Sequence, residues 1–197
     1  MNWQMVYAVD LLSEYEMTGS LDGVLPRASG IYLWRLRLRP SCHPKDGVGV
    51  LQHVKRLSLM PLGELGPVDL SRGFRLNSLR LGGVGLPPLK YEALENMVSE
   101  EAGAKYLSDF LADLESRSPA LYCGESGNLS VRIRDHLRCQ SDFGETICSH
   151  EDISWSDLRL DYVVTGKEQG SGANQYRTAM EYLATLLTLS AYTKRAG

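Results

Sequence analysis

Two residues in the last third of the chain could act together on a phosphate group. Arg132 and His136 are four residues apart, so in a helix they lie on one face. An arginine there can hold the non-bridging oxygens of a phosphate and stabilise the charge that develops on them. A histidine can accept or relay a proton near neutral pH. A pair of this spacing is usually structural when it stands alone, so the residues around it decide whether it indicates catalysis.

The residues before this pair make the pattern more specific. Tyr122-Cys123-Gly124 precedes it, with Arg132 ten residues after Tyr122 and His136 four residues later. Ninety residues before Tyr122, the run Gly30-Ile31-Tyr32 begins a segment with the alternation of a strand. These segments resemble the signature of the GIY-YIG nuclease family. The resemblance covers residues 28–40 and 119–190 and says little about the rest.

The resemblance implies metal-assisted hydrolysis of a phosphodiester bond. It implies that the catalytic residues are Tyr32, Tyr122, Arg132, His136 and Glu181, the last in residues 177–183, which resemble the last helix of the family. Glu181 would bind Mg²⁺, with Mn²⁺ as a substitute; one carboxylate suffices because water and phosphate complete the octahedron. Which tyrosine is the base stays open, because a free phenol has a pKa of about 10.

Structural alternatives exist for each of these residues. A tyrosine more often packs in a core with its hydroxyl satisfied, and a helical glutamate is more often solvated. Glu181, however, lies among the apolar residues Met180, Leu183 and Ala184. Solvation on a polar helix face therefore explains an acid at this position less well. The family often has an asparagine after this helix, and residues 190–195 contain none.

The distribution of charge along the chain predicts a phosphate-binding surface. The net charge is −3, which by itself argues against a nucleic-acid partner. Residues 27–90, however, contain eleven basic and three acidic residues, a net charge of +8, while residues 91–116 carry −6. Such segregation favours a surface for double-stranded DNA, although the two segments could simply neutralise each other. The candidate DNA-binding residues are Arg35, Arg37, Lys55, Arg56, Arg72, Arg75 and Arg134.

Hydrophobic patterns predict an α+β fold that positions these residues. The order of elements outside a large mixed insertion is strand, strand, helix, strand, helix. This order agrees with the fold that the resemblance implies, a small three-stranded antiparallel sheet flanked by helices, with the insertion between the first two strands. The predicted strands are 30–38, 120–123 and 158–165, and the predicted helices are 5–17, 128–138 and 173–192. Residues 1–27 form an N-terminal helical segment, 28–40 and 119–197 the nuclease-like core, and 41–118 the insertion. In the insertion, 48–50, 54–60 and 74–81 are strand candidates and 88–115 is helical.

Composition excludes several classes of protein. Apolar residues make up 43% of the 197 residues, and no apolar run approaches the length of a membrane span, about 20 residues. The four cysteines are too sparse for a disulfide scaffold and have no zinc-finger spacing. We therefore expect a reduced, cytoplasmic protein without a membrane partner.

Two hypotheses of different classes follow. The first is a Mg²⁺-dependent endodeoxyribonuclease, of the restriction or defence type because no separate DNA-binding domain is evident. Cutting both strands with one site per chain would favour a homodimer or sequential nicking. The second is a nucleic-acid-binding or regulatory module that keeps the fold without cutting. Survival of all five motif residues favours the first, and the large insertion permits the second.

Overall fold

The computed structural model describes residues 2–65, 68–71, 74–76, 79–83, 85–165 and 178–184. The chain divides into two compact units. Unit 1 comprises Met1–Arg37 and Ser118–Gly197, and unit 2 comprises Leu38–Arg117. All five residues that the sequence analysis assigns to catalysis belong to unit 1.

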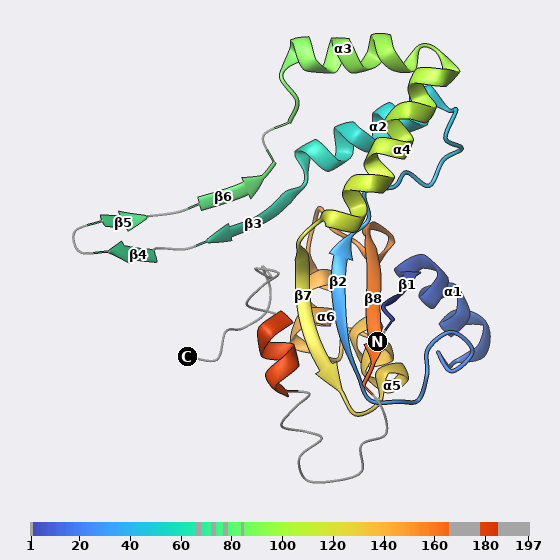
Figure 1. Cartoon of the computed structure of the whole chain (residues 1–197), viewed down its shortest axis with the longest axis vertical. Coiled ribbons are helices and arrows are strands. Elements are labelled where there is room, and N and C mark those ends of the chain that lie inside the picture. The colour runs from blue at the N-terminus through green and yellow to red at the C-terminus, as the bar shows by residue number, and fades with distance from the viewer. Residues whose placement is uncertain are drawn as a thin grey trace. The chain divides into compact units, whose positions relative to one another are not determined.

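Unit 1 is built on an antiparallel sheet with the strand order β1-β8-β2-β7 (Figure 1). The strands are β1 (Gln4–Tyr7), β2 (Gly30–Leu36), β7 (Ala120–Ser126) and β8 (Leu158–Val164). The predicted α+β class and the three predicted strands are confirmed. The sheet has four strands in the described structure, however, so the predicted strand number is wrong.

The additional strand comes from a segment that was predicted to be helical. The helix α1 spans Ala8–Thr18, whereas the residues before it form β1 and pair with β8 from Gln4↔Tyr162 to Tyr7↔Arg159. Without β1, the outer edge of β8 would leave its backbone N–H and C=O groups without ladder partners. This long-range pairing outweighs the local helical pattern at residues 5–7.

Both faces of the central strand β2 are buried. Tyr32, Trp34 and Leu36 point to one face, and Ile31 and Leu33 to the other. The first face is covered by α5 (Leu129–Leu137), α6 (Asp142–Ser149) and a 3₁₀ turn (Trp155–Asp157), whose aromatic rings pack around Trp34. The second face carries an apolar cluster that includes Met180 and Ala184 of the helical residues 178–184.

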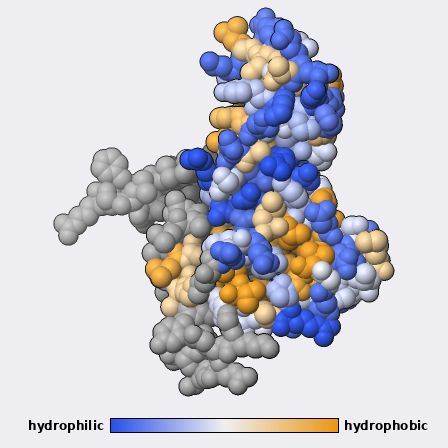
Figure 2. Space-filling view, turned by 45° about the vertical axis from the view of Figure 1, so that its right-hand side comes forward, coloured by the Kyte–Doolittle hydropathy of each residue, from blue (hydrophilic) through white to orange (hydrophobic). Residues whose placement is uncertain are grey.

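Unit 2 has its own helical core. The helices α2 (Gly47–Leu59), α3 (Pro88–Val98) and α4 (Glu101–Arg117) bury a shared set of apolar side chains: Val50, Leu51, Val98, Ala104, Leu107 and Leu111. Strand β3 (Pro61–Leu65) pairs with β6 (Leu79–Gly82), and β4 (Val68–Ser71) pairs with β5 (Phe74–Leu76). Over the helices of unit 2, hydrophilic side chains predominate on the face shown in Figure 2.

The strands predicted at residues 48–50 and 54–60 are wrong, because this segment is the helix α2. Val50, Leu51 and Val54 recur at helical spacing and pack on the helical core of unit 2. The Asp46 carboxylate accepts a hydrogen bond from the Gly49 N–H at 3.0 Å and so caps the helix. Packing and capping together outweigh the strand preference of the valines.

The cysteines differ from the sequence expectation. Cys139 and Cys148 form a disulfide between the C-terminal ends of α5 and α6, with Cα atoms 6.2 Å apart. The prediction that all four cysteines are reduced is therefore wrong for this pair, while Cys42 and Cys123 form no disulfide. The cysteines meet because Cys139 adopts a φ of 57°, which turns the chain after α5, and α6 then returns Cys148 to it.

We predict that replacing Cys139 and Cys148 together by alanine lowers the free energy of unfolding by about 2–3 kcal/mol. A cross-link that closes a short loop restricts the unfolded chain by that order of magnitude. Urea unfolding monitored by circular dichroism, with and without dithiothreitol, measures the effect. Reductant should destabilise the wild type and leave the double variant unchanged; a wild-type transition that ignores reductant would contradict the prediction.

Candidate active site

Tyr32 is the centre of the candidate site. It lies in the middle of β2, its side chain is completely buried, and its partner across the ladder on β7 is Gly124. A Cβ atom on Gly124 would lie 2.4 Å from Tyr32 Oη and 2.6 Å from its Cζ. The missing side chain at position 124 therefore makes the room in which the tyrosine hydroxyl sits.

The helix α5 directs Arg132 and His136 at this hydroxyl. Asn128 is the N-cap of this helix, since its side chain accepts a hydrogen bond from the Val131 N–H at 3.3 Å. His136 Nε2 lies 2.7 Å from Tyr32 Oη, and Arg132 Nε donates to the same oxygen at 3.3 Å. The two residues that were predicted to share a helix face thus converge on one oxygen.

Tyr122 completes a four-residue cluster with Tyr32, Arg132 and His136. Its ring centroid lies 6.1 Å from that of Tyr32 and 5.5 Å from that of His136. Its side chain lies close enough to Tyr32 and Arg132 to raise the pKa of both, and its ring stacks on that of Phe143, with ring centroids 4.6 Å apart. Tyr122 and Arg132 are half-buried, whereas Tyr32 and His136 are completely buried, so the cluster reaches solvent through its first two members.

Burial determines the charges of this four-residue cluster. Burial raises the pKa of Tyr32 well above its usual value, and nearby Tyr122 adds to the rise, while the hydrogen bond from Arg132 opposes it. Burial also lowers the pKa of His136 to about 3, and the charge of Arg132 lowers it further. Burial opposes the charge of Arg132, but its bond to Tyr32 leaves that pKa raised. At neutral pH the cluster therefore carries a single positive charge, on Arg132.

Glu181 approaches the sheet from the other face. It belongs to the helical residues 178–184, whose Met180 and Ala184 pack on the apolar cluster opposite Tyr32. The Cys123 thiol donates to the backbone oxygen of Glu181 at 3.7 Å, beside the edge strand β7 (Figure 1). The described contacts of this helix are thus with β7 and the far face. The structure brings four of the five predicted catalytic residues together.

Arg35 of β2, one of the candidate DNA-binding residues, is engaged inside the protein. Arg35 Nε donates to Asp161 Oδ2 at 2.8 Å, and its side chain is only 15% exposed. Arg35 also donates to the backbone oxygen of Ser118, and Arg159 donates to the same Asp161 oxygen at 3.1 Å. Arg35 is therefore largely buried and paired within the protein, which argues against its predicted contact with DNA.

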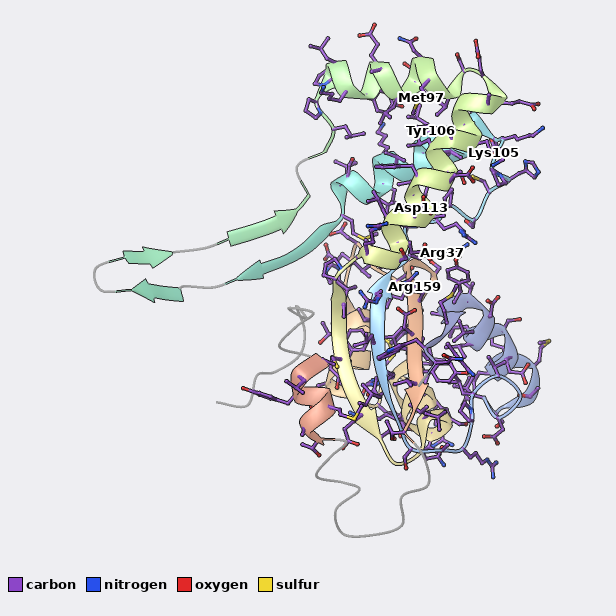
Figure 3. The ribbon with its side chains drawn as sticks, viewed as in Figure 1. Arg37, Met97, Lys105, Tyr106, Asp113 and Arg159 are labelled. Carbon is purple, nitrogen blue, oxygen red and sulfur yellow. A yellow bond between two sulfur atoms is a disulfide. The ribbon has the colours of Figure 1, made fainter. Side chains whose placement is uncertain are left out.

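The other DNA-binding candidates of unit 1 also have protein partners. The Arg37 guanidinium lies over the ring of Tyr7, 4.5 Å from its centroid; Figure 3 shows Arg37 at the end of the sheet where Arg159 also lies. Arg134 pairs with its neighbour Asp135 at 3.0 Å and keeps about a third of its side chain exposed. A phosphate would have to compete with these partners.

In unit 2 the candidates fall into two groups. Lys55 and Arg56 are exposed on α2, and Lys55 lines a pocket of about 360 Å³ together with Tyr91. Arg72 lies outside the described residues, and for Arg75 the structure describes only the backbone of β5. The acidic stretch 91–116 forms α3 and α4, and its exposed acidic residues are Glu92, Glu95, Glu100, Glu101, Asp109 and Asp113. Figure 3 shows Asp113 on α4 with Lys105 and Tyr106.

The sequence analysis did not identify two residues around the imidazole of His136. Ser141 Oγ lies 2.5 Å from His136 Nδ1, and the Phe143 ring lies edge-on to the imidazole with centroids 5.6 Å apart. A signal for Ser141 was present: a serine directly before Asp142, with Glu145 four residues on, is typical of a helix N-cap. No local pattern points to Phe143.

Comparisons with protein-family models, with curated proteins and with solved structures give no match to this chain. No helix in the described part of the chain is long and apolar enough to span a membrane. Nor do the described residues contain a group of three or more His, Cys, Asp or Glu side chains that could hold a metal ion. The features of the chain that indicate a function are therefore the four-residue cluster and the motif that predicts it.

We predict that His136 makes the protein lose stability in mild acid. Its folded pKa of about 3 lies below the unfolded value of 6.5, so the unfolded chain binds a proton first as the pH falls. The free energy of unfolding should therefore fall from pH 6.5 downward, by up to about 1.4 kcal/mol per pH unit, until the pH nears 3. Urea titrations between pH 8 and pH 5 measure this dependence.

The variant His136→Gln provides the control, because it keeps a polar side chain but cannot titrate. Its stability should depend less on pH than that of the wild type between pH 6.5 and 5. Identical slopes for the two proteins would show that His136 is not the buried neutral group.

Proposed function

We propose that the chain is a metal-dependent endonuclease of the GIY-YIG type that hydrolyses phosphodiester bonds in double-stranded DNA. The observation that carries the proposal is the convergence of Arg132 and His136 on the Tyr32 hydroxyl beside Tyr122. The same four residues are the ones that the spacing of the motif selects. A site with one cation among neutral groups suits a phosphodiester, which carries a single negative charge.

The chain's own residues have distinct tasks in this proposal. Arg132 is half-buried, so it can reach a phosphate oxygen and stabilise the charge that develops on it. Tyr122 is half-buried too and is the tyrosine that an attacking water can contact. Tyr32 lies behind it, completely buried, with the two ring centroids 6.1 Å apart. The buried rings of Trp34 and Phe143 keep bulk water away from His136.

Glu181 fits the metal requirement by its chemistry. Mg²⁺ prefers oxygen ligands and often takes only one or two protein carboxylates, and Glu181 is half-buried rather than sequestered. Glu181 would hold the ion, with water and the phosphate as the other ligands. When bound, the ion would stabilise charge on the phosphate and on the leaving oxygen.

One observation favours a second candidate, a nucleic-acid-binding module that does not cut. Tyr32 and His136 are completely buried, and the described contacts of the helix with Glu181 are on the opposite face of the sheet. A protein that needs these residues only for packing would have this arrangement. Binding without cleavage distinguishes this candidate from the nuclease.

Unit 2 is the proposed DNA-binding element of the nuclease. It contains the exposed Lys55 and Arg56 and most of the basic stretch 27–90. A nuclease that carries its recognition element inside one short chain suits a restriction or defence enzyme, and cutting both strands would need a homodimer or sequential nicking.

We predict that Arg132→Ala slows DNA cleavage by at least about two orders of magnitude, because it removes the cation that stabilises the transition state.

Glu181→Gln should abolish cleavage while leaving DNA affinity within a few-fold, because the carboxylate serves the metal. Relaxation of a supercoiled plasmid in Mg²⁺, in Mn²⁺ and in excess chelator measures cleavage.

Matched controls are Arg138→Ala and Glu145→Gln, which change exposed residues of the same two types. Both should cleave like the wild type. Wild-type cleavage in excess chelator would exclude the metal, and a wild type that binds DNA but never cuts it would favour the second candidate.

We predict that Lys55→Ala with Arg56→Ala weakens DNA binding and reduces its salt dependence. Each phosphate contact releases counterions, so losing one contact should lower the slope of log K against log salt by about one. Fluorescence anisotropy with a labelled duplex at several salt concentrations measures the slope. Lys105→Ala on α4 is the control; an unchanged slope in the double variant would remove α2 from the DNA interface.

A further inference from the structure

Ser141 occupies a defined position between α6 and the imidazole of His136. Its side chain is 9% exposed, and it is the N-cap of α6. Its Oγ accepts a hydrogen bond from the Gly144 N–H at 3.1 Å and lies 2.5 Å from His136 Nδ1. In the described structure these are the two polar partners of the Ser141 hydroxyl.

These contacts favour one tautomer of His136. Gly144 donates to Ser141 Oγ, so the acceptor left for the serine's own proton is His136 Nδ1. A neutral imidazole has one N–H group, and a buried histidine next to Arg132 stays neutral. With Nδ1 accepting, the N–H is at Nε2, which then donates to Tyr32 Oη at 2.7 Å.

This arrangement places two N–H donors on the Tyr32 oxygen, while burial raises the pKa of Tyr32 and keeps it protonated. Its oxygen accepts one hydrogen bond from His136 Nε2–H and one from Arg132 Nε–H, and two donors favour the charged form of an acceptor. The half-buried Tyr122 lies beside Tyr32, with ring centroids 6.1 Å apart, and adds to the rise in the pKa of Tyr32. Tyr32 is neutral at neutral pH, so with two N–H donors on its oxygen its own O–H is left to donate on the side of the half-buried Tyr122. His136 would act as a hydrogen-bond donor and not as the base.

The loop that carries Ser141 is held in place by two further features. The Cys139–Cys148 disulfide closes the segment that contains Ser141 and α6. A Cβ atom on Gly144 would lie 2.4 Å from the backbone oxygen of His136, so only glycine allows α6 to approach α5 this closely. The hydroxyl of Ser141 is thus presented to Nδ1 by the fold around it.

We propose that Ser141 is a positioning residue that fixes His136 as the Nε2–H tautomer and thereby makes it a hydrogen-bond donor to Tyr32. The consequence for catalysis depends on the proposed nuclease function, but the tautomer itself does not.

Two substitutions separate this role from helix capping. Ser141→Thr keeps a hydroxyl at the same place. Ser141→Gly removes the hydroxyl at little cost to the helix, because glycine replaces serine at an N-cap with little loss. In protein labelled with ¹⁵N-histidine, two-bond ¹H–¹⁵N correlation spectra identify the protonated ring nitrogen, and the His136→Gln spectrum assigns the signals among the four histidines.

We expect a bare Nδ1 and a protonated Nε2 in the wild type and in Ser141→Thr, and loss of this single tautomer in Ser141→Gly. The kcat of plasmid cleavage should fall at least about tenfold in Ser141→Gly alone, with KM unchanged. A wild-type spectrum with a protonated Nδ1 would overturn the proposal, as would Ser141→Gly that keeps the tautomer and the wild-type kcat. A wild type that has the expected tautomer but does not cleave DNA would refute the nuclease function and leave this assignment intact.

Discussion

The buried hydrogen bond between Tyr32 Oη and His136 Nε2 is the contact on which the rest of unit 1 depends. Both side chains are shielded from water, so burying either polar group without a hydrogen-bond partner would reduce the free energy of unfolding. Their 2.7 Å separation satisfies both and sets the distance between β2 and α5. The same requirement makes Gly124 necessary on β7, because any larger residue there would occupy the place of the tyrosine hydroxyl.

The same burial decides how charge is divided within the site. An imidazole surrounded by Tyr122, Trp34 and Phe143 and next to Arg132 cannot easily take a proton. The positive charge of the four-residue cluster is therefore left to Arg132, which is half-buried and can be neutralised by a ligand from solvent. Packing of the aromatic layer and the electrostatics of the site thus have a common cause.

Local signals made much of unit 1 predictable. The alternation in β2, the Asn128 cap of α5 and the spacing of Arg132 and His136 involve near neighbours, and the structure has each of them. The features that the sequence did not indicate depend on distant partners. The strand β1 exists because β8 has an open edge, and the valines of α2 become helical against α3 and α4. The pairing of Cys139 with Cys148 needed α6, whose capping signal at Ser141 was overlooked.

The arginines show that a count of charges along the sequence does not tell which of those charges a ligand can reach. Residues 27–90 carry a net charge of +8. That value measures the charge available to phosphates only if none of the basic residues is already paired within the protein. Arg35 is not, because it pairs with Asp161, an acid more than a hundred residues away that no local count includes. A pair this well shielded resists salt and competing phosphates more than an exposed pair does. The positive charge that the basic stretch presents to solvent is therefore smaller than its sequence suggests, and exposed residues such as Lys55 carry a larger share of it.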